Sequence, residues 1–227
     1  MASPSAERLK ERLNEVRCLV GVCRSRRARA AKAIKSEEPA LLRSALVMLC
    51  SHVEGYFEDL VEDVLLAFDG RAARSDQLPQ PIRVRQTLGT TARWEVNDAK
   101  KRWLLVQECS SSPLLVDAAP HVAGGFDSGL HTGTFANPGT SQIRDLFETV
   151  GISDVWAEFA KIEPGVAYKN EIDAIVSRRN QIAHGDRTSL VTESDVQNYL
   201  LNFAHTASVF EALAAKHIAS TFPGFAW

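Results

Sequence analysis

The sequence is 227 residues long, about one and a half times a typical domain, and we expect a single domain over residues 1–227. Hydrophobic residues make up 45% of the chain and charged residues 24%, which excludes a disordered tail, a collagen-like rod and a membrane bundle. The 26 lysines and arginines against 28 aspartates and glutamates give a formal net charge of −2. Any site for a polyanion must therefore be a local basic patch.

The chain lacks the patterns that direct a protein to or across a membrane. No apolar run follows a basic start, as in a signal peptide, and no apolar run is long enough to span a bilayer. No pair of cysteines has the Cys-x-x-Cys spacing, so we expect reduced thiols at Cys18, Cys23, Cys50 and Cys109. These features predict a cytoplasmic protein without membrane contact.

The first third of the chain predicts two long helices. Apolar residues recur every three or four positions over residues 5–36 and again, more strongly, over 40–69. Pro39 suits the first turn of the second helix, and Gly70 should end it in a left-handed conformation. The short connection between the two helices predicts an antiparallel pair.

The middle of the chain is less regular. Residues 71–91 are polar and contain two prolines, so we expect a loop there, followed by a helix near 92–109. Residues 111–140 are rich in glycine and proline and predict a long loop-rich insertion. A loop of this length is unusual in a compact domain, so it is functional, mobile, or contains short elements that the pattern does not reveal.

Helical patterning returns in the last third of the chain. Gly185 ends a helix that begins near Tyr168, and Thr192 with Asp195 forms a capping box. That capping box opens a long final helix, and two shorter helices are expected at 141–150 and 153–161. The helices at both ends of the chain should pack around the second long helix, which makes the predicted fold class all-α.

The helix that ends at Gly185 carries a group of polar side chains near its last turn. Asn180 and His184 are four residues apart and share a helix face, and the long side chain of Arg179 can swing toward them. Unpaired carbonyls at a helix end favour imidazolium, which suits His184 to both proton acceptance and donation. A permanent cation, a titrating imidazole and an amide together suit phosphate chemistry. The same residues also fit a structural role, in which His184 binds the last carbonyls and the arginines are surface charges.

The run Arg-Asn-Gln-Ile-Ala-His-Gly at 179–185 resembles the Arg-x4–6-His signature of HEPN domains, including the polar residue directly after the arginine. The segment 46–61, which contains Glu54, is similar to the helix that HEPN proteins of the RiboL-PSP and related groups place before the signature. The resemblance implies an HEPN-type helical bundle with long antiparallel helices and a long Gly/Pro-rich insertion.

The resemblance also implies an activity. Active HEPN proteins of toxin–antitoxin, abortive-infection and antiviral systems cleave RNA, and two protomers place their signature helices in a shared cleft. Cleavage uses the 2′-hydroxyl of the RNA as nucleophile and gives a 2′,3′-cyclic phosphate and a 5′-hydroxyl, without a metal or cofactor. The implied partners are RNA, a second copy of the chain in a homodimer, and a cognate antitoxin or regulatory protein.

The resemblance assigns roles to individual residues. Arg179 would hold and neutralise the scissile phosphate, and His184 would act as general acid or base. Asn180 would orient the phosphate or the imidazole, and Glu54 would fix Arg179 or His184. Arg178 would be a second phosphate contact, and the sequence does not say which arginine is primary.

A basic run near the end of the first helix is a further candidate for RNA binding. Arg24 and Arg27 belong to a run of positive charges with no acidic residue between them. In a helix these charges would surround most of the cylinder and could contact the phosphate backbone. A solvated helix face interleaved with alanines accounts for the same run.

The glycine-rich insertion predicts no metal or nucleotide site. His121, Asp127 and His131 lie within it, but their spacing fits no established metal site. The glycines lack the Gly-Lys-Ser/Thr of a phosphate-binding loop, which excludes a Walker motif. A loop that gates the substrate or binds a partner is the better interpretation.

The sequence leaves three classes of function open: an endoribonuclease, a catalytically inactive HEPN-like module that binds RNA, nucleotides or proteins, and a structural helical adaptor. An inactive module would be expected to lack one member of the Arg-Asn…His set. This chain retains Arg179, Asn180 and His184, which favours the enzyme.

Overall fold

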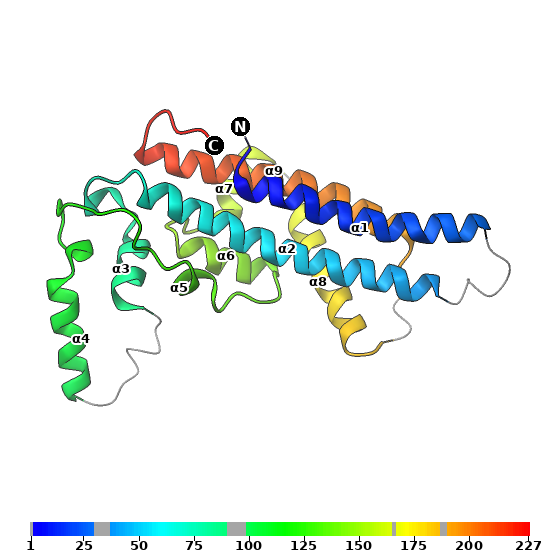
Figure 1. Cartoon of the computed structure of the whole chain (residues 1–227), viewed down its shortest axis with the longest axis horizontal. Helices are drawn as coiled ribbons and strands as arrows, with labels where there is room; N and C mark the ends of the chain where they lie inside the picture. Colours follow the sequence, from blue (N-terminus) through cyan, green and yellow to red (C-terminus); the bar gives the residue numbers. More distant parts are fainter. Residues whose placement is uncertain (1, 30–36, 90–98, 165–166, 187–189) are drawn as a thin grey trace.

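The computed structural model describes residues 2–29, 37–89, 99–164, 167–186 and 190–227. Over these residues the chain is all-α, as predicted, with short 3-10 turns at Ser75–Gln77 and Pro113–Leu115 and no strand (Figure 1). The helices are α1 Pro4–Arg29, α2 Glu38–Asp69, α3 Gln80–Leu88, α4 Ala99–Ser111, α5 Gly129–Thr132, α6 Thr140–Glu148, α7 Val155–Ile162, α8 Ala167–Ala183 and α9 Glu193–Thr221. Within the described ranges, every helix is too short or too polar to cross a bilayer.

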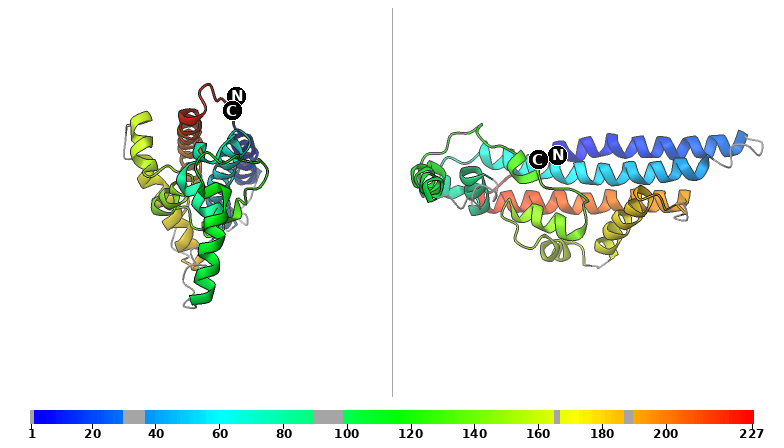
Figure 2. Two further views of the ribbon diagram at one scale, coloured as in Figure 1. Left: turned by 90° about the vertical axis from the view of Figure 1, so that its left-hand side faces the viewer. Right: turned by 90° about the horizontal axis from the view of Figure 1, so that it is seen from below.

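Three long helices form the body of the molecule. α1 and α2 run antiparallel and pack along one another, and α9 lies against both, so the two ends of the chain meet on α2 (Figures 1 and 2). This confirms the predicted antiparallel pair and the predicted packing of the terminal helices. Residues 30–36, which the sequence assigned to the end of the first helix, lie outside the described residues.

Aromatic side chains join the shorter helices to this body. The ring of Phe57 on α2 meets Phe210 of α9 edge-on, with centroids 4.9 Å apart, and Phe147 of α6 at 6.1 Å. Trp156 of α7 also meets Phe210 edge-on, at 5.5 Å. Such edge-to-face pairs stabilise a core beyond the area that they bury. The core therefore fixes α6 and α7, and with them the loop that precedes α6, relative to α2 and α9.

The middle of the chain departs from the prediction at two places. Residues 71–91 contain α3, because Pro81 lies in the first turn of that helix, where its missing N–H is tolerated. Gly70 is right-handed, with φ −76°, and not left-handed, because the N–H of Ala72 still bonds the carbonyl of Phe68 in a further helical turn. The glycine-rich insertion is mostly irregular, as expected, and contains the single turn of α5.

Two helices project from the body in the same general direction. α4 contacts α3 at one end of the molecule (Figures 1 and 2). Its side chains Trp103 and Leu104 are exposed. It begins later than the helix predicted near 92–109, and residues 90–98 lie outside the described residues. α8 packs on α2, α6 and α9 through the buried Ile172 and Ile175, and its C-terminal end points away from the long helices (Figure 1). The polar group identified in the sequence lies at this end of α8.

Candidate functional site

The end of α8 is closed by a left-handed glycine. Gly185 has φ +83°, and its N–H bonds the carbonyl of Ile182 at 3.0 Å. The N–H of Asp186 bonds the carbonyl of Gln181, also at 3.0 Å, which completes a Schellman motif. His184 is the last residue whose N–H stays in the helical ladder, bonding the carbonyl of Asn180 at 2.9 Å. The predicted helix stop is therefore confirmed, with His184 as the capping residue.

Arg179 is held by two amide oxygens. Its Nη1 donates to Oδ1 of Asn180 at 2.9 Å and to Oδ1 of Asn137 at 2.7 Å. Asn180 is the neighbour that the sequence analysis paired with Arg179, whereas Asn137 comes from the insertion before α6 and was not identified. No periodicity or motif marked Asn137, since the bond joins residues 42 positions apart.

Arg178 has a different environment from that of Arg179. Its Nη1 lies 3.2 Å from Oδ2 of Asp195 and 3.3 Å from the hydroxyl of Tyr199, both on α9. Asp195 also closes the predicted capping box with Thr192, whose N–H donates to Oδ2 at 2.9 Å. Burial opposes ionisation of Asp195, but hydrogen bonds from Thr192 and the charge of Arg178 outweigh it and lower the pKa of the carboxyl. Arg178 therefore forms an ion pair that ties α8 to α9.

Glu54 and Arg179 both act on one buried thiol. Burial raises the pKa of Cys50 on α2 to about 11; the charge of Glu54 raises it further, and that of Arg179 opposes the shift. Glu54 lies one turn beyond Cys50 and is half-buried. Among the described residues, no hydrogen bond or ion pair joins Glu54 to Arg179. Both charges thus lie within electrostatic range of Cys50, and among the described residues Glu54 does not form the direct contact that the resemblance implied.

The imidazole of His184 is exposed to solvent. It lies one turn beyond Asn180 on the same helix face, as the spacing predicted. In the part of the chain that the structure describes, its side chain forms no hydrogen bond with Arg179, Asn180 or Glu54. A phosphate could therefore reach the imidazole from solvent.

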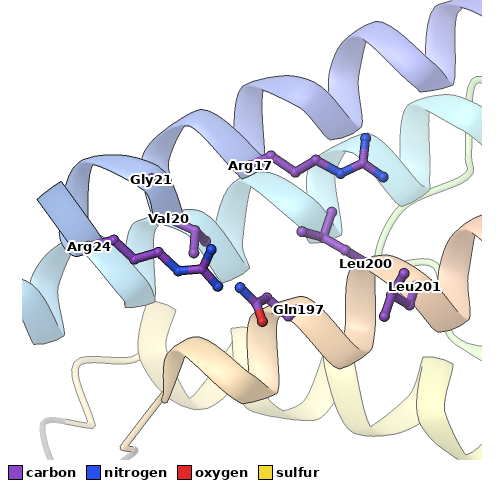
Figure 3. Close-up of a pocket in the computed structure, with 7 residues that line it drawn as sticks. All are labelled: Arg17, Val20, Gly21, Arg24, Gln197, Leu200 and Leu201. Carbon is purple, nitrogen blue, oxygen red and sulfur yellow. The ribbon is translucent and has the colours of Figure 1, made fainter.

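Arg24 lies on the other side of α9 from the signature residues. Its guanidinium pairs with Glu193 in the first turn of α9, the turn that also holds Asp195. Residues two apart on a helix point to nearly opposite sides, so Glu193 and Asp195 face different neighbours. Arg24 instead borders a cavity of about 330 Å³ between α1 and α9 (Figure 3), lined by Arg17, Val20, Gly21, Arg24, Gln197, Leu200 and Leu201. The side chain of Arg27 lies outside the described residues.

The two histidines of the insertion, His121 and His131, contact different parts of the protein. Nε2 of His121 lies 2.8 Å from Oδ1 of Asp69, and both side chains are buried. His131 is buried beside Gln86, with 3.2 Å between the two Nε2 atoms. These contacts attach the insertion to α2 and α3. Across the described residues, no group of three or more histidines, cysteines, aspartates or glutamates could hold a metal ion.

The helical bundle and the Arg-Asn…His set at the end of α8 define an HEPN-type protein. The model of the RiboL-PSP-HEPN family matches residues 7–213, which is most of the chain. The chain therefore belongs to the HEPN RiboL-PSP family, which confirms the resemblance and indicates nuclease or RNA-related activity. Comparisons with curated proteins and with solved structures gave no match.

Proposed function

We propose that the protein is a metal-independent endoribonuclease of a bacterial toxin–antitoxin or antiviral defence system. It cleaves RNA by attack of the 2′-hydroxyl and leaves a 2′,3′-cyclic phosphate and a 5′-hydroxyl. The observation that carries the proposal is the guanidinium of Arg179, held by neutral acceptors five residues before an exposed histidine. The whole chain, residues 1–227, acts as one HEPN domain in the cytoplasm.

Arg179 is the primary phosphate contact in this proposal, and Arg178 is secondary. The described hydrogen bonds of Arg179 go to the amide oxygens of Asn137 and Asn180, which carry no charge. The charge of Arg178 is partly compensated by Asp195 at 3.2 Å. An uncompensated guanidinium attracts a phosphodiester more strongly, and its N–H groups on Nη2 and Nε match two phosphate oxygens.

His184 acts as the general acid or base. A positioned side chain in this role contributes about 10²–10⁴ in rate. The RNA supplies its own nucleophile, so no serine or cysteine needs to be activated, and DNA is not cleaved because it lacks the 2′-hydroxyl. Asn180 orients Arg179, and Glu54 contributes a negative charge near it rather than a bond.

Two copies of the chain complete the site. The end of α8 projects from the body (Figure 1). Because His184 at this end is exposed, two such ends can face one another across a two-fold axis. RNA would lie in the groove between them. A cognate antitoxin or regulatory protein would then control access to that groove.

His184→Ala tests the proposal, with His205→Ala as the matched control. His205 is also an exposed histidine; it pairs with Glu163, the residue after α7, and its ring meets Tyr168 at the opposite end of α8 from His184. We expect His184→Ala to lower RNA cleavage about 10²–10⁴-fold without changing thermal stability, and His205→Ala to cleave normally. Both assays contain excess EDTA, and an all-2′-deoxy substrate should stay intact. Equal cleavage by His184→Ala would remove His184 from the mechanism, and loss of activity on chelation would indicate a metal site.

The alternative is an inactive HEPN-like module that binds RNA, nucleotides or proteins. The observation that favours it is the absence of any described bond between His184 and Arg179. It predicts RNA binding without new 5′-hydroxyl ends. Mapping of RNA ends after expression of the wild-type and His184→Ala chains separates the two functions.

A further inference from the structure

A short segment of the insertion is fixed directly onto α8. The N–H and the hydroxyl of Thr140 donate to Oδ1 and Oδ2 of Asp173 on α8, each at 2.8 Å. The indole N–H of Trp156 on α7 donates to the carbonyl of Thr140, also at 2.8 Å. Three hydrogen bonds from two helices therefore hold the end of this segment.

Gly139 lets the segment approach α8 closely. Pro138 and Gly139 are buried, and a Cβ added at Gly139 would lie 2.9 Å from Oε1 of Gln142 and 3.4 Å from Oδ1 of Asp173. An added methyl group would have to displace the amide of Gln142 and would come into contact with Asp173. Packing and hydrogen bonds thus fix the backbone at 137–140. The backbone position of Asn137 therefore does not depend on the contact that its side chain makes.

Asn137 adopts a backbone conformation that few residues tolerate. Its φ is +54°, and asparagine and aspartate are the non-glycine residues that most readily adopt the left-handed region. This conformation directs Oδ1 to Nη1 of Arg179, at 2.7 Å. If only the backbone conformation mattered at this position, glycine would serve equally well, but glycine could not accept the bond from Arg179.

The bond from Asn137 removes freedom from the group that we propose binds phosphate. An arginine side chain has several rotatable bonds, and ordering it when substrate binds costs free energy. Nη1 of Arg179 donates to the amide oxygens of both Asn180 and Asn137, and these two bonds fix the plane of the guanidinium in the free protein. Both acceptors are neutral amides, so they orient the cation without cancelling its charge.

We propose that Asn137 is a positioning residue that orients Arg179 toward the scissile phosphate. This inference rests on the proposed ribonuclease function and extends the site to the insertion. It also gives that insertion a defined task in the reaction. In this proposal the side chain of Asn137 acts on Arg179 and does not contact the RNA.

Two substitutions separate the backbone role of Asn137 from its side-chain role. Asn137→Gly keeps the left-handed conformation and removes the acceptor, whereas Asn137→Asp keeps both and adds a negative charge. We expect Asn137→Gly to lower kcat on the order of 10²-fold, because the guanidinium is misplaced, with an unchanged thermal midpoint. Asn137→Asp should raise KM and reduce the salt dependence of RNA binding by about one phosphate contact, because the carboxylate neutralises Arg179. Ala136→Asp adds the same charge at the neighbouring exposed residue and should have a much smaller effect on both.

A double substitution tests whether Asn137 acts through Arg179. In an Arg179→Lys background, Asn137→Gly should cause almost no further loss of kcat, since the group that it orients is already gone. Wild-type kcat and KM in Asn137→Gly, or a full additional loss in the Arg179→Lys background, would overturn the proposal.

A measurement without substrate keeps this inference separate from the proposed function. The Nε–H signal of Arg179, followed by NMR in the free protein, should be dispersed in the wild type and should move to the position of a mobile arginine in Asn137→Gly. If the signal moves but the wild type cleaves no RNA, the ribonuclease function fails and the orienting contact stands. If the signal does not move, the inference about Asn137 is wrong, whatever the enzyme does.

Discussion

The aromatic core and the end of α8 are built in opposite ways. In the core, the buried ring of Phe57 meets Phe147 and Phe210, and stability comes from many contacts that water cannot reach. At the end of α8, Arg179 is held by two hydrogen bonds and His184 is exposed. This difference between the core and the end of α8 indicates that folding and the proposed chemistry depend on separate residues. Substitutions in one region should therefore change one measurement and leave the other nearly unchanged.

The largest expected effect on stability comes from the core. Phe57→Ala removes a fully buried ring and leaves a cavity, so we expect the free energy of unfolding to fall by about 3–5 kcal/mol. Chemical denaturation measures this loss, and the cleavage rate per folded molecule should change little. Leu66→Ala on the same helix is the control, because Leu66 is 58% exposed and its truncation should cost far less. Similar losses for the two variants would contradict this account of the core.

The largest expected effect on activity, apart from the loss of His184, comes from Arg179. Arg179→Lys keeps the charge but cannot use both amide acceptors and a phosphate in one plane, so we expect cleavage to fall about 10²–10³-fold. Arg178→Lys keeps an ion pair with Asp195 and should lose less than about tenfold. Single-turnover cleavage rates of the two variants measure the difference. A larger loss for Arg178→Lys would reverse the assignment of the primary phosphate contact.

Acid should destabilise the fold through the insertion before it affects the core. Burial, followed by the nearby charge of Arg85, lowers the pKa of His131 to about 4 from an ordinary value of 6.5. Because the unfolded chain binds the proton more readily, stability is full above pH 6.5 and falls as the pH drops toward 4, by about 3 kcal/mol in total. Denaturation at a series of pH values measures this loss. His131→Gln should reduce the dependence between these two pH values, while His217, whose pKa is also lowered by burial, accounts for part of the rest; an unchanged profile would exclude His131 as a cause.

The smallest effect is expected at the start of α9. Thr192→Ala removes the side-chain oxygen that accepts from the N–H of Asp195 at 3.1 Å, so we expect a loss of about 1 kcal/mol in the free energy of unfolding. Ser194→Ala, at an exposed residue in the same turn, should change it by much less. Because Asp195 also pairs with Arg178, a small change in cleavage by Thr192→Ala would show that this ion pair steadies α8.

Features set by neighbouring residues were predictable from the sequence. The capping box at Thr192 and the stop at Gly185 depend on side chains a few positions apart, and both are confirmed. α3 was missed because its prolines indicate a break, although proline in the first turn is compatible with a helix. The prediction of a left-handed conformation at Gly70 was wrong, because the chain continues there through a further right-handed turn. In these two cases the tertiary context decided between conformations that the local sequence allows.

The candidate site was only partly predictable for a related reason. The residues on α8 follow from their spacing along one helix, and the family resemblance added Glu54 on α2. The bond from Arg179 to Asn137 depends on how the insertion folds back over α8, which no spacing encodes. Likewise, only the packing of α8 against α9 shows that Arg178 is paired with Asp195 and that Arg179 is not.

The left-handed Gly185 fixes the geometry of the site in a further way. Because the helix stops immediately after His184, the rise and rotation between Arg179 and His184 are those of five helical steps and cannot be adjusted by a shift of register. One residue inserted between them would turn the imidazole by about 100° around the helix axis and move it by about 1.5 Å along that axis. The imidazole would then point in another direction while the guanidinium stayed in place. In this chain, the separation of the two groups therefore follows from the residue at which the backbone leaves the helix.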